Sequence, residues 1–449
     1  MLSGSGQIPM TTMDSKTLRT RYISAFKNLD PVARLGSVQR IMPTYIEADG
    51  PGVTLGSLCT VDGVMAEVVK AERGLITLAP YAPVTSLRIG DRVEAVRADA
   101  QASVSSHLLG RVVDALGRPI DGGRPLPPSG ENWPLAGIET AALDRVTASQ
   151  PLETGCRAID GLLTLGIGQR VGIFAGSGIG KTTLLRGFTR HIQADVCVLC
   201  LVGERGREAD EFWHHALNEE ARKRSVMVVA TSDRPAVMRA RSVTLALAYA
   251  EYFRAQGKHV LLLLDSITRY ALALREIGLA AGEPPTVRAY TPGVFAALPK
   301  IVERCGALRK GGAITAVMTV LTETDDIDDP MAETLRALLD GHIVLTRALA
   351  EQGQFPAIDV PRSLSRFFRQ VTTEEERALA TEAVEQLSLY DASRTLVESG
   401  LYIAGSHPAL DRALAARPAL IRFLKQDLTM PTQRAQAMTE LAALLRTSA

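Results

Sequence analysis

The middle of the chain alternates between short apolar runs and longer stretches with a helical pattern. Apolar runs of strand length lie at 170–174, 196–202, 226–230, 260–264, 313–320 and 342–345. Helical stretches separate them, for example 182–192 and 236–254. Strands that are apolar throughout and alternate with helices are typical of a parallel sheet covered on both faces. The pattern therefore predicts an α/β fold for this part of the chain.

Different patterns flank this region. Before about residue 97, short β-type runs alternate with glycine, aspartate and proline, which predicts a small β-barrel. After about Thr372 only helical patterns remain. We expect an N-terminal arm over 1–33, a barrel over 34–99, an α/β core over 100–375 and a helical domain over 376–449.

The arm itself permits two interpretations. Leu18, Tyr22, Ile23 and Phe26 fall near helical spacing, so a short amphipathic helix is expected. Such a helix could dock a partner protein. A frayed terminus, or a helix packed on its own domain, explains the same spacing equally well.

Composition and charge narrow the functional classes. Lys and Arg total 50 and Asp and Glu total 49, so there is no general electrostatic reason for the chain to coat nucleic acid. The five cysteines are scattered, which fits a reducing compartment better than a disulfide scaffold. The N-terminal sequence has no apolar signal region, and no apolar run is long enough to span a bilayer. A cytoplasmic protein is expected, with any membrane association made through partners.

A glycine-rich loop, AGSGIGKT, joins the first apolar run of the core to a helical stretch. Glycines allow a tight backbone whose N–H groups converge on an anion, and the helix that follows points its positive end at the same place. Lys181 can reach the β- and γ-phosphates, and the hydroxyl of Thr182 can complete a Mg²⁺ shell. Ala175 replaces the usual first glycine, a position that needs only a small residue. The expected nucleotide contacts are Ala175, Gly176, Ser177, Gly178, Ile179, Gly180, Lys181, Thr182 and Thr183.

Two carboxylates follow neighbouring apolar runs. Asp265 ends HVLLLLD, and Glu204 follows VCVLCLVG. The carboxyl ends of parallel strands meet at the edge where α/β sheets bind ligands. Asp265 is therefore predicted to hold Mg²⁺, although it could instead cap the next helix. Glu204 is predicted to polarise the attacking water, although it could instead be a surface carboxylate paired with Arg205 or Arg207.

Several longer motifs resemble one family. GERGRE (203–208), LLLLDSITRYA, LALREIGLAAGEPP and LGRVVDALGRPIDG are similar to the flagellar and type III secretion export ATPases. These are relatives of the catalytic subunit of rotary ATP synthases. The resemblance runs from about residue 34 to the C-terminus. It implies a β-barrel, a RecA-like P-loop core and a helical C-terminal domain, assembled as a homohexamer with Mg-ATP at the subunit interfaces.

The resemblance also implies roles for single residues. Glu204 matches the catalytic glutamate and Asp265 the Walker B aspartate. Arg366, in PRSLSRFFRQ, matches the arginine that reaches into the neighbouring subunit's site; without the motif it would be read as a surface residue near Arg362 and Arg369. Arg205 is a second candidate for a phosphate or interface contact. Tyr402 is a candidate adenine contact from a match in the C-terminal region.

The motif set also bears on function. Gly206 stands where synthase catalytic subunits typically carry threonine, which favours the export branch. FAGSGIGKTTLL and GHIVLTRALAEQGQFPAIDV favour the flagellar system over the injectisome, the main alternative. Expected partners are regulator or stator proteins, a stalk protein, chaperones and exported substrates, with indirect attachment to the inner membrane at the export gate and no nucleic acid. A synthase catalytic subunit, a non-catalytic ring subunit and a Rho-like RNA translocase are the remaining alternatives.

Three further features are not expected to form sites. Cys197 and Cys200 lie in an apolar strand with no second ligand pair at zinc spacing. His214 and His215 are adjacent and so cannot share a helix face. The acidic run 323–329 lacks the glycine and terminal glutamate of a calcium-binding loop, so a solvated or interface loop is expected.

Overall fold

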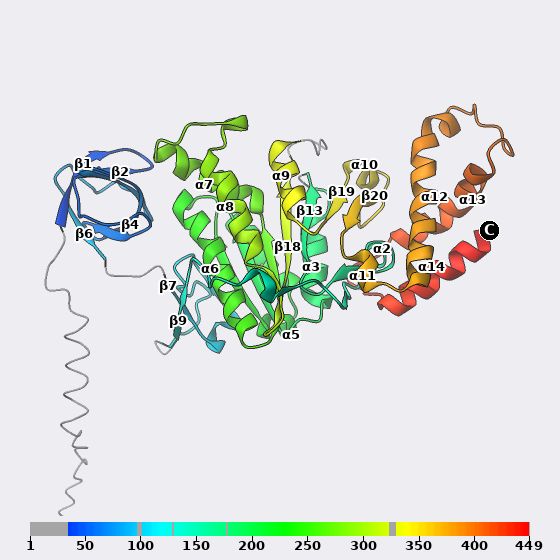
Figure 1. Ribbon diagram of the computed structural model, residues 1–449, viewed down its shortest axis with the longest axis horizontal. Coiled ribbons are helices and arrows are strands. Elements are labelled where there is room, and N and C mark those ends of the chain that lie inside the picture. Colours follow the sequence, from blue (N-terminus) through cyan, green and yellow to red (C-terminus); the bar gives the residue numbers. More distant parts are fainter. Residues whose placement is uncertain (1–34, 97–100, 128–129, 177, 323–328, 449) are drawn as a thin grey trace, which may run out of the picture.

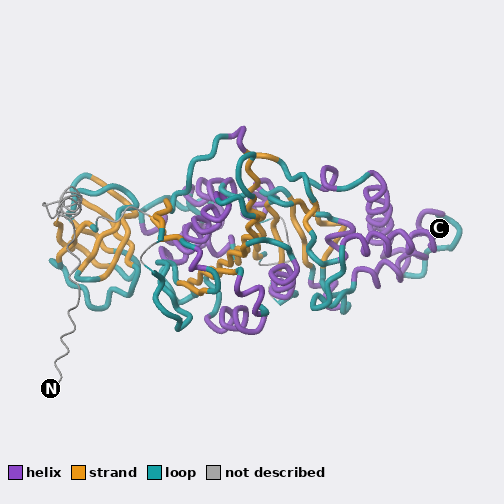
Figure 2. Tube along the Cα trace, turned by 90° about the horizontal axis from the view of Figure 1, so that it is seen from below, coloured by secondary structure: helices purple, strands orange, loops and turns teal. Residues whose placement is uncertain are grey.

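The computed structural model describes residues 35–96, 101–127, 130–176, 178–322 and 329–448. A β-barrel lies at one end of the long axis, an α/β core in the middle and a group of helices at the other end (Figures 1 and 2). The predicted fold class is therefore confirmed. The predicted N-terminal arm lies outside the described residues.

Six strands close the barrel in the order β1-β2-β5-β4-β3-β6, and each pairs antiparallel with its neighbours. Alternate residues point inward, as a period of two requires, and Val38, Ile46 and Val93 are fully buried in its core. The strands are β1 (Leu35–Ile41), β2 (Ile46–Ala48), β3 (Leu58–Val61), β4 (Val64–Glu72), β5 (Leu75–Pro80) and β6 (Arg92–Ala95).

The core contains a sheet in the order β20-β19-β13-β18-β16-β14-β15-β8. It is parallel from β19 to β8, and β20 is antiparallel at one edge. These strands are β8 (Arg111–Val113), β13 (Arg170–Ala175), β14 (Val196–Val202), β15 (Ser225–Ala230), β16 (His259–Asp265), β18 (Ala313–Leu321), β19 (Gly341–Leu345) and β20 (Ile358–Ser365). The shorter strands are β7 (Gln101–Val104), β9 (Glu131–Pro134), β10 (Arg145–Val146), β11 (Pro151–Leu152), β12 (Leu165–Gly166) and β17 (Gly306–Leu308).

Helices cover both faces of this sheet (Figure 1). Residues of one strand alternate between two apolar cores: Cys197 belongs to the core that includes α3, and Cys200 belongs to the core that includes α6. The two thiols therefore face opposite sides of β14 and cannot share a metal. The helices of this region are α2 (Arg157–Leu162), α3 (Lys181–His191), α4 (Gly206–Glu211), α5 (Glu219–Lys223), α6 (Ala236–Ala255), α7 (Ile267–Ala280), α8 (Pro292–Glu303), α9 (Pro330–Leu338), α10 (Arg347–Glu351) and α11 (Phe368–Val371).

Three helices form the C-terminal region: α12 (Glu374–Glu398), α13 (Pro408–Leu424) and α14 (Arg434–Ser448). α12 starts with a capping box in which the hydroxyl of Thr373 accepts the backbone N–H of Glu376, and the carboxylate of Glu376 accepts the N–H of Thr373. Buried residues of these helices, such as Leu420 and Phe423, join the same apolar core as α2 and α3. The C-terminal helices are therefore packed against α2, which precedes the glycine-rich loop, in an apolar core that α3 also joins.

No helix among the described residues is both long enough and apolar enough to cross a bilayer.

Candidate functional site

The glycine-rich loop lies between β13 and α3, as the sequence predicted. Gly178 and Gly180 have φ of 81° and 93°, a backbone conformation that favours glycine. Ala175 is the last residue of β13 and is 1% exposed, and Ile179 is buried in the same core. Ala175 is therefore part of the buried strand, where its methyl group packs in the core, and the two buried side chains anchor the loop at both ends. Ser177 lies outside the described residues.

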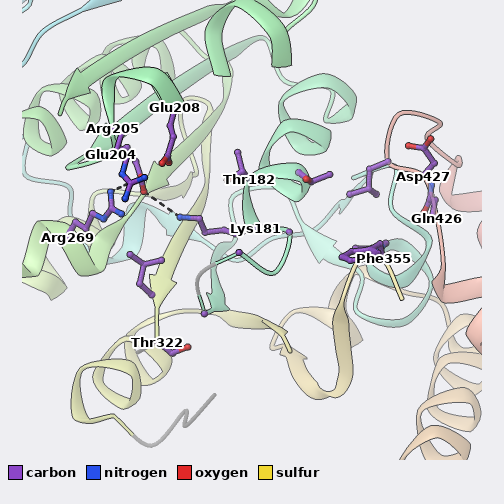
Figure 3. A pocket seen from close by; sticks show the side chains of 17 residues that line it. Lys181, Thr182, Glu204, Arg205, Glu208, Arg269, Thr322, Phe355, Gln426 and Asp427 are labelled. Atoms are coloured by element: carbon purple, nitrogen blue, oxygen red, sulfur yellow. Dashed lines mark ion pairs between the residues drawn. The ribbon is translucent and has the colours of Figure 1, made fainter. Parts of the chain in front are cut away.

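Lys181 lies close to both predicted carboxylates, and Figure 3 shows its ion pair with Glu204. Its Nζ lies 2.6 Å from Oδ1 of Asp265 and 3.6 Å from Oε1 of Glu204. β16 and β14 are neighbouring parallel strands and end at the same edge of the sheet. The fold therefore brings Asp265 and Glu204 together although they are 61 positions apart in the sequence. The hydroxyl of Thr319, on β18, also donates to Oδ1 of Asp265 at 2.6 Å. Asp265 does not cap α7, because the side chain of Ser266 does.

Glu204 has a buried carboxylate oxygen that lacks a hydrogen-bond partner among the described residues. It is 5% exposed, and its Oε1 is buried and accepts no hydrogen bond from any described residue. Its Oε2 pairs with Nη1 of Arg269 at 2.7 Å. Burial, and then the nearby charge of Asp265, raise the pKa of Glu204, while Lys181 and Arg269 work in the opposite direction. Glu204 pairs with these two cations and not with Arg205 or Arg207, so it is not a surface carboxylate.

The sequence interpretation missed Arg269 and Glu208. Arg269 lies in the first turn of α7, and its guanidinium also donates to the carbonyl of Gly203. Glu208 lies in the first turn of α4, and both new residues line the cleft that contains Lys181. Their positions in the first turns of the two helices that follow β14 and β16 were the signal that could have identified them.

The cleft has a volume of about 960 Å³ and extends well beyond the lysine. Thr182 lines its middle and Arg205 the end near Glu204 (Figure 3), and Thr183 is also a lining residue. At the other end lie Phe355, which is 51% exposed, and the segment that joins α13 to α14 (Figure 3). The lining residues of this end are Phe355, Pro356, Gln426, Asp427 and Leu428.

Some predicted site residues do not line the cleft among the described residues: Ala175, Ile179, Asp265, Arg366 and Tyr402. Ala175 and Ile179 are buried at the two ends of the loop and Asp265 is paired with Lys181, whereas Arg366 and Tyr402 lie elsewhere. Arg366 is an exposed residue directly after β20, and its guanidinium donates to the carbonyl of Arg336. Tyr402 lies between α12 and α13, where its hydroxyl donates to Asp411 at 2.8 Å. The placement of Tyr402 gives no support to an adenine contact within one subunit.

The residues fit a magnesium ion bound together with a nucleotide. In the described part of the chain, no group of three or more His, Cys, Asp or Glu side chains could hold a metal by itself. Mg²⁺ in nucleotide sites keeps several waters and uses one or two protein oxygens plus phosphates. Thr182, which lines the cleft, and Asp265, which is paired with Lys181, offer oxygen ligands, and this set suits such an ion.

Comparison with known proteins decides the family. Residues 155–365 match the ATP synthase alpha/beta family, nucleotide-binding domain, and residues 372–443 match the T3SS EscN ATPase C-terminal domain. A flagellum-specific ATP synthase from Bacillus subtilis is 43% identical over 434 residues, which cover 94% of this chain and 98% of that relative. The chain belongs to the flagellar and type III secretion ATPases. The predicted family, and with it the predicted P-loop ATP hydrolase, are confirmed.

Relatives from both export systems are similar to this ATPase. The SPI-2 type 3 secretion system ATPase of Salmonella typhimurium is 47% identical over 401 residues, covering 89% of this chain and 92% of that relative. The solved structure of the assembled ATPase EscN from enteropathogenic E. coli superposes with a TM-score of 0.88 at 39% identity, covering 91% of this chain and all of that one. A second structure contains EscN with its central stalk EscO, with a TM-score of 0.84 at 39% identity.

Proposed function

We propose that this ATPase hydrolyses Mg-ATP at sites completed by a neighbouring copy in a homohexamer, and that hydrolysis assists protein export by a flagellar type III apparatus. The observation that carries the catalytic part is that Lys181, which lines the cleft, lies within ion-pair distance of both Glu204 and Asp265, while Oε1 of Glu204 is buried and accepts no hydrogen bond from the described residues. A carboxylate oxygen that accepts no hydrogen bond from the protein has its lone pairs available to accept a proton or to orient a water molecule that enters the cleft.

Each residue has a chemical task in this proposal. The loop N–H groups and Lys181 bind the β- and γ-phosphates. Thr182 and Asp265 would hold Mg²⁺, which would supply positive charge to neutralise the phosphate oxygens. Asp265, now paired with Lys181, would be available to the ion once the lysine binds phosphate. Glu204 then orients the attacking water.

Two arginines of the same subunit complete the phosphate end. Arg205 and Arg269 both line the cleft, and Arg269 holds one oxygen of Glu204. Both can bind the phosphate oxygens, and Arg269 also fixes the side chain of the catalytic glutamate. At the other end, the half-exposed ring of Phe355 offers a surface on which the adenine can stack.

Arg366 is assigned to the cleft of the adjacent subunit. It is exposed and lies outside its own cleft, as a residue that acts across an interface must. A guanidinium brought in by a second subunit stabilises charge on the transferring phosphoryl group. Mixing Arg366→Ala with Lys181→Ala subunits tests this directly, because a mixed ring contains interfaces in which both residues are native. Recovery of hydrolysis supports the assignment; no recovery in verified mixed rings contradicts it.

The catalytic proposal is tested by phosphate release from Mg-ATP. Lys181→Ala should abolish release by the purified protein, and chelation of magnesium should do the same to the native protein. Lys310→Ala, at an exposed lysine of the same domain, is the matched control and should keep native activity. An active Lys181→Ala protein would overturn the site.

The proposal also covers which export system the ATPase serves and which proteins it binds. We favour the flagellar system because of the motifs around the glycine-rich loop and at 341–360, with the injectisome as the alternative. The EscN–EscO structure supports a stalk partner, and we place the ATPase in the cytoplasm, attached to the inner membrane through the export gate. Pull-downs with flagellar and with injectisome stalk and regulator proteins distinguish the systems: selective binding of the injectisome set would overturn the flagellar assignment.

A further inference from the structure

The segment 425–432 lies between α13 and α14 and forms one wall of the cleft far from Lys181 (Figure 3). Gln426 and Leu428 of this segment line the cleft, and Gln426 lies close to Phe355. The segment belongs to the C-terminal helices, whereas Phe355 precedes β20 in the core. The base end of the cleft is therefore made by two parts of the chain that are distant in sequence.

Gln426 joins these parts through its backbone and its side chain. Its backbone N–H donates to the carbonyl of Phe355 at 2.9 Å. Its side-chain Oε1 accepts the backbone N–H of Arg157 at 2.8 Å, and its Nε2 donates to the carbonyl of Gly155 at 2.8 Å. Nε2 also lies within hydrogen-bond distance of the Met430 carbonyl and the Thr432 hydroxyl. An amide has two N–H donors, so this group has no donor left for a nucleobase.

Other bonds hold the same segment on the same turn. The backbone N–H of Thr432 donates to the carbonyl of Gly155, and the guanidinium of Arg157 donates to the carbonyl of Lys425 at 2.6 Å. His191, the last residue of α3, is bonded through Nε2 to the carbonyl of Leu428 at 2.8 Å. The segment is thus attached both to residues 155–157 and to the helix that begins at Lys181.

The turn that receives these bonds is itself fixed. The buried carboxylate of Asp160 accepts the backbone N–H groups of Thr154 and Gly155 and the hydroxyl of Thr154, at 2.7 to 3.2 Å. Gly155 has φ of 76° and a Cβ there would lie 2.9 Å from Pro431, so the segment approaches the turn closely. Gln426 therefore links the base end of the cleft to a rigid part of the core.

From these contacts we infer that Gln426 is a positioning residue for the nucleoside: it sets the affinity for nucleotide by holding the 425–432 wall and the Phe355 carbonyl against the 155–157 turn, and it touches neither phosphates nor base. The inference rests on the proposed ATP site. It assigns the effect of Gln426 to binding and not to the chemical step, because Lys181, Glu204 and Asp265 are held by contacts that do not involve this segment.

The test compares Gln426→Ala with Gln426→Met, which keeps the side-chain volume without the hydrogen bonds. Gln436→Ala, at an exposed glutamine of α14, is the control. Losing one or two structural hydrogen bonds should weaken ADP binding and raise the KM for ATP roughly tenfold, with kcat within about twofold of native. The control should behave as native. Thermal melting curves show whether each variant is folded.

A double-mutant cycle with Phe355→Ala separates positioning from general destabilisation. If Gln426 acts through the base wall, adding Gln426→Met to Phe355→Ala should weaken ADP binding by much less than it does alone. Full additivity, a loss of kcat at unchanged KM, or native ADP affinity in both Gln426 variants would overturn the inference. Absence of ATP hydrolysis by the native protein is a separate outcome and would count against the proposed function.

Discussion

The two ends of the nucleotide cleft are built in different ways. At the phosphate end, Asp265 is the last residue of β16, while Glu204 and Lys181 lie in the connections that follow β14 and β13, so the parallel topology of one sheet brings them together. At the base end, Phe355 comes from a connection before β20, and Gln426 comes from a connection between two C-terminal helices. The residues proposed for the chemical step therefore lie in short motifs, whereas those proposed to hold the base come together only through tertiary packing.

The largest effect is expected at the phosphate end, from the loss of the arginine that the adjacent subunit is proposed to contribute. Arg366→Ala should lower kcat by about 10³-fold or more, as the loss of an arginine that stabilises transferring phosphate does. ADP binding to isolated subunits should stay native, because Arg366 lies outside its own cleft. Steady-state hydrolysis and ADP titration measure the two quantities. Arg362→Ala, at an exposed arginine of β20, is the control, and native turnover by Arg366→Ala would remove this residue from the mechanism.

The second largest effect is expected on the free energy of unfolding, when the turn at 155–157 that holds the base end loses its hydrogen-bond acceptor. Asp160→Ala leaves the backbone N–H groups of Thr154 and Gly155 without their acceptor, so the free energy of unfolding should fall by about 2–4 kcal/mol. Urea denaturation measures it, with the exposed Asp210→Ala as control. A change below about 0.5 kcal/mol, the range of ordinary surface substitutions, would show that the 155–157 turn does not depend on Asp160.

A smaller effect is expected at the base end itself. Phe355→Ala should weaken ADP binding by roughly 5- to 100-fold, since stacking on an aromatic ring contributes about 1–3 kcal/mol per base. Phe355→Tyr keeps the ring and should bind as the native protein does. Fluorescence titration with ADP gives both dissociation constants. Equal affinities of the alanine and tyrosine variants would show that the ring is not the base platform.

The smallest effect is a shift in pH dependence. The raised pKa of Glu204 means that this carboxylate takes up a proton at a higher pH than an ordinary glutamate with a pKa of 4.5. The unprotonated form is needed to orient water, so kcat/KM should fall with decreasing pH already above pH 4.5. Arg269→Gln removes a cation that lowers the pKa of Glu204. In this variant the fall of kcat/KM at acidic pH should therefore begin at a still higher pH. A limb at or below pH 4.5 in the native protein, or a downward shift in the variant, would contradict the electrostatics.

Much of the fold was predictable because the strands have simple patterns. The strand predicted at 260–264 is β16, and the helix predicted at 236–254 is α6, since apolar runs and helical spacing are local properties. The barrel's closure and the order of the sheet were not encoded in such patterns. The order β13-β18-β16-β14 places β18 beside β13 although more than a hundred residues separate them.

The candidate site divides in the same way. Lys181, Glu204 and Asp265 were identified from motifs that follow strands, and the structure brings them together. Gln426 and Phe355 carry no motif, and their role becomes visible only when α13, α14 and the 155–157 turn are packed. Tyr402 was proposed from a C-terminal match, whereas the structure places it in a different loop of the C-terminal helices.

The most direct test of the account is the turnover of Glu204→Gln. Glutamine keeps the size of the side chain and removes the charge that would orient water. We expect kcat to fall by roughly 10²- to 10⁴-fold while ADP binding stays within a few fold of native, and Glu220→Gln, at an exposed glutamate, to remain fully active. Turnover by Glu204→Gln at the native rate would contradict the assignment of this buried carboxylate as the catalytic group.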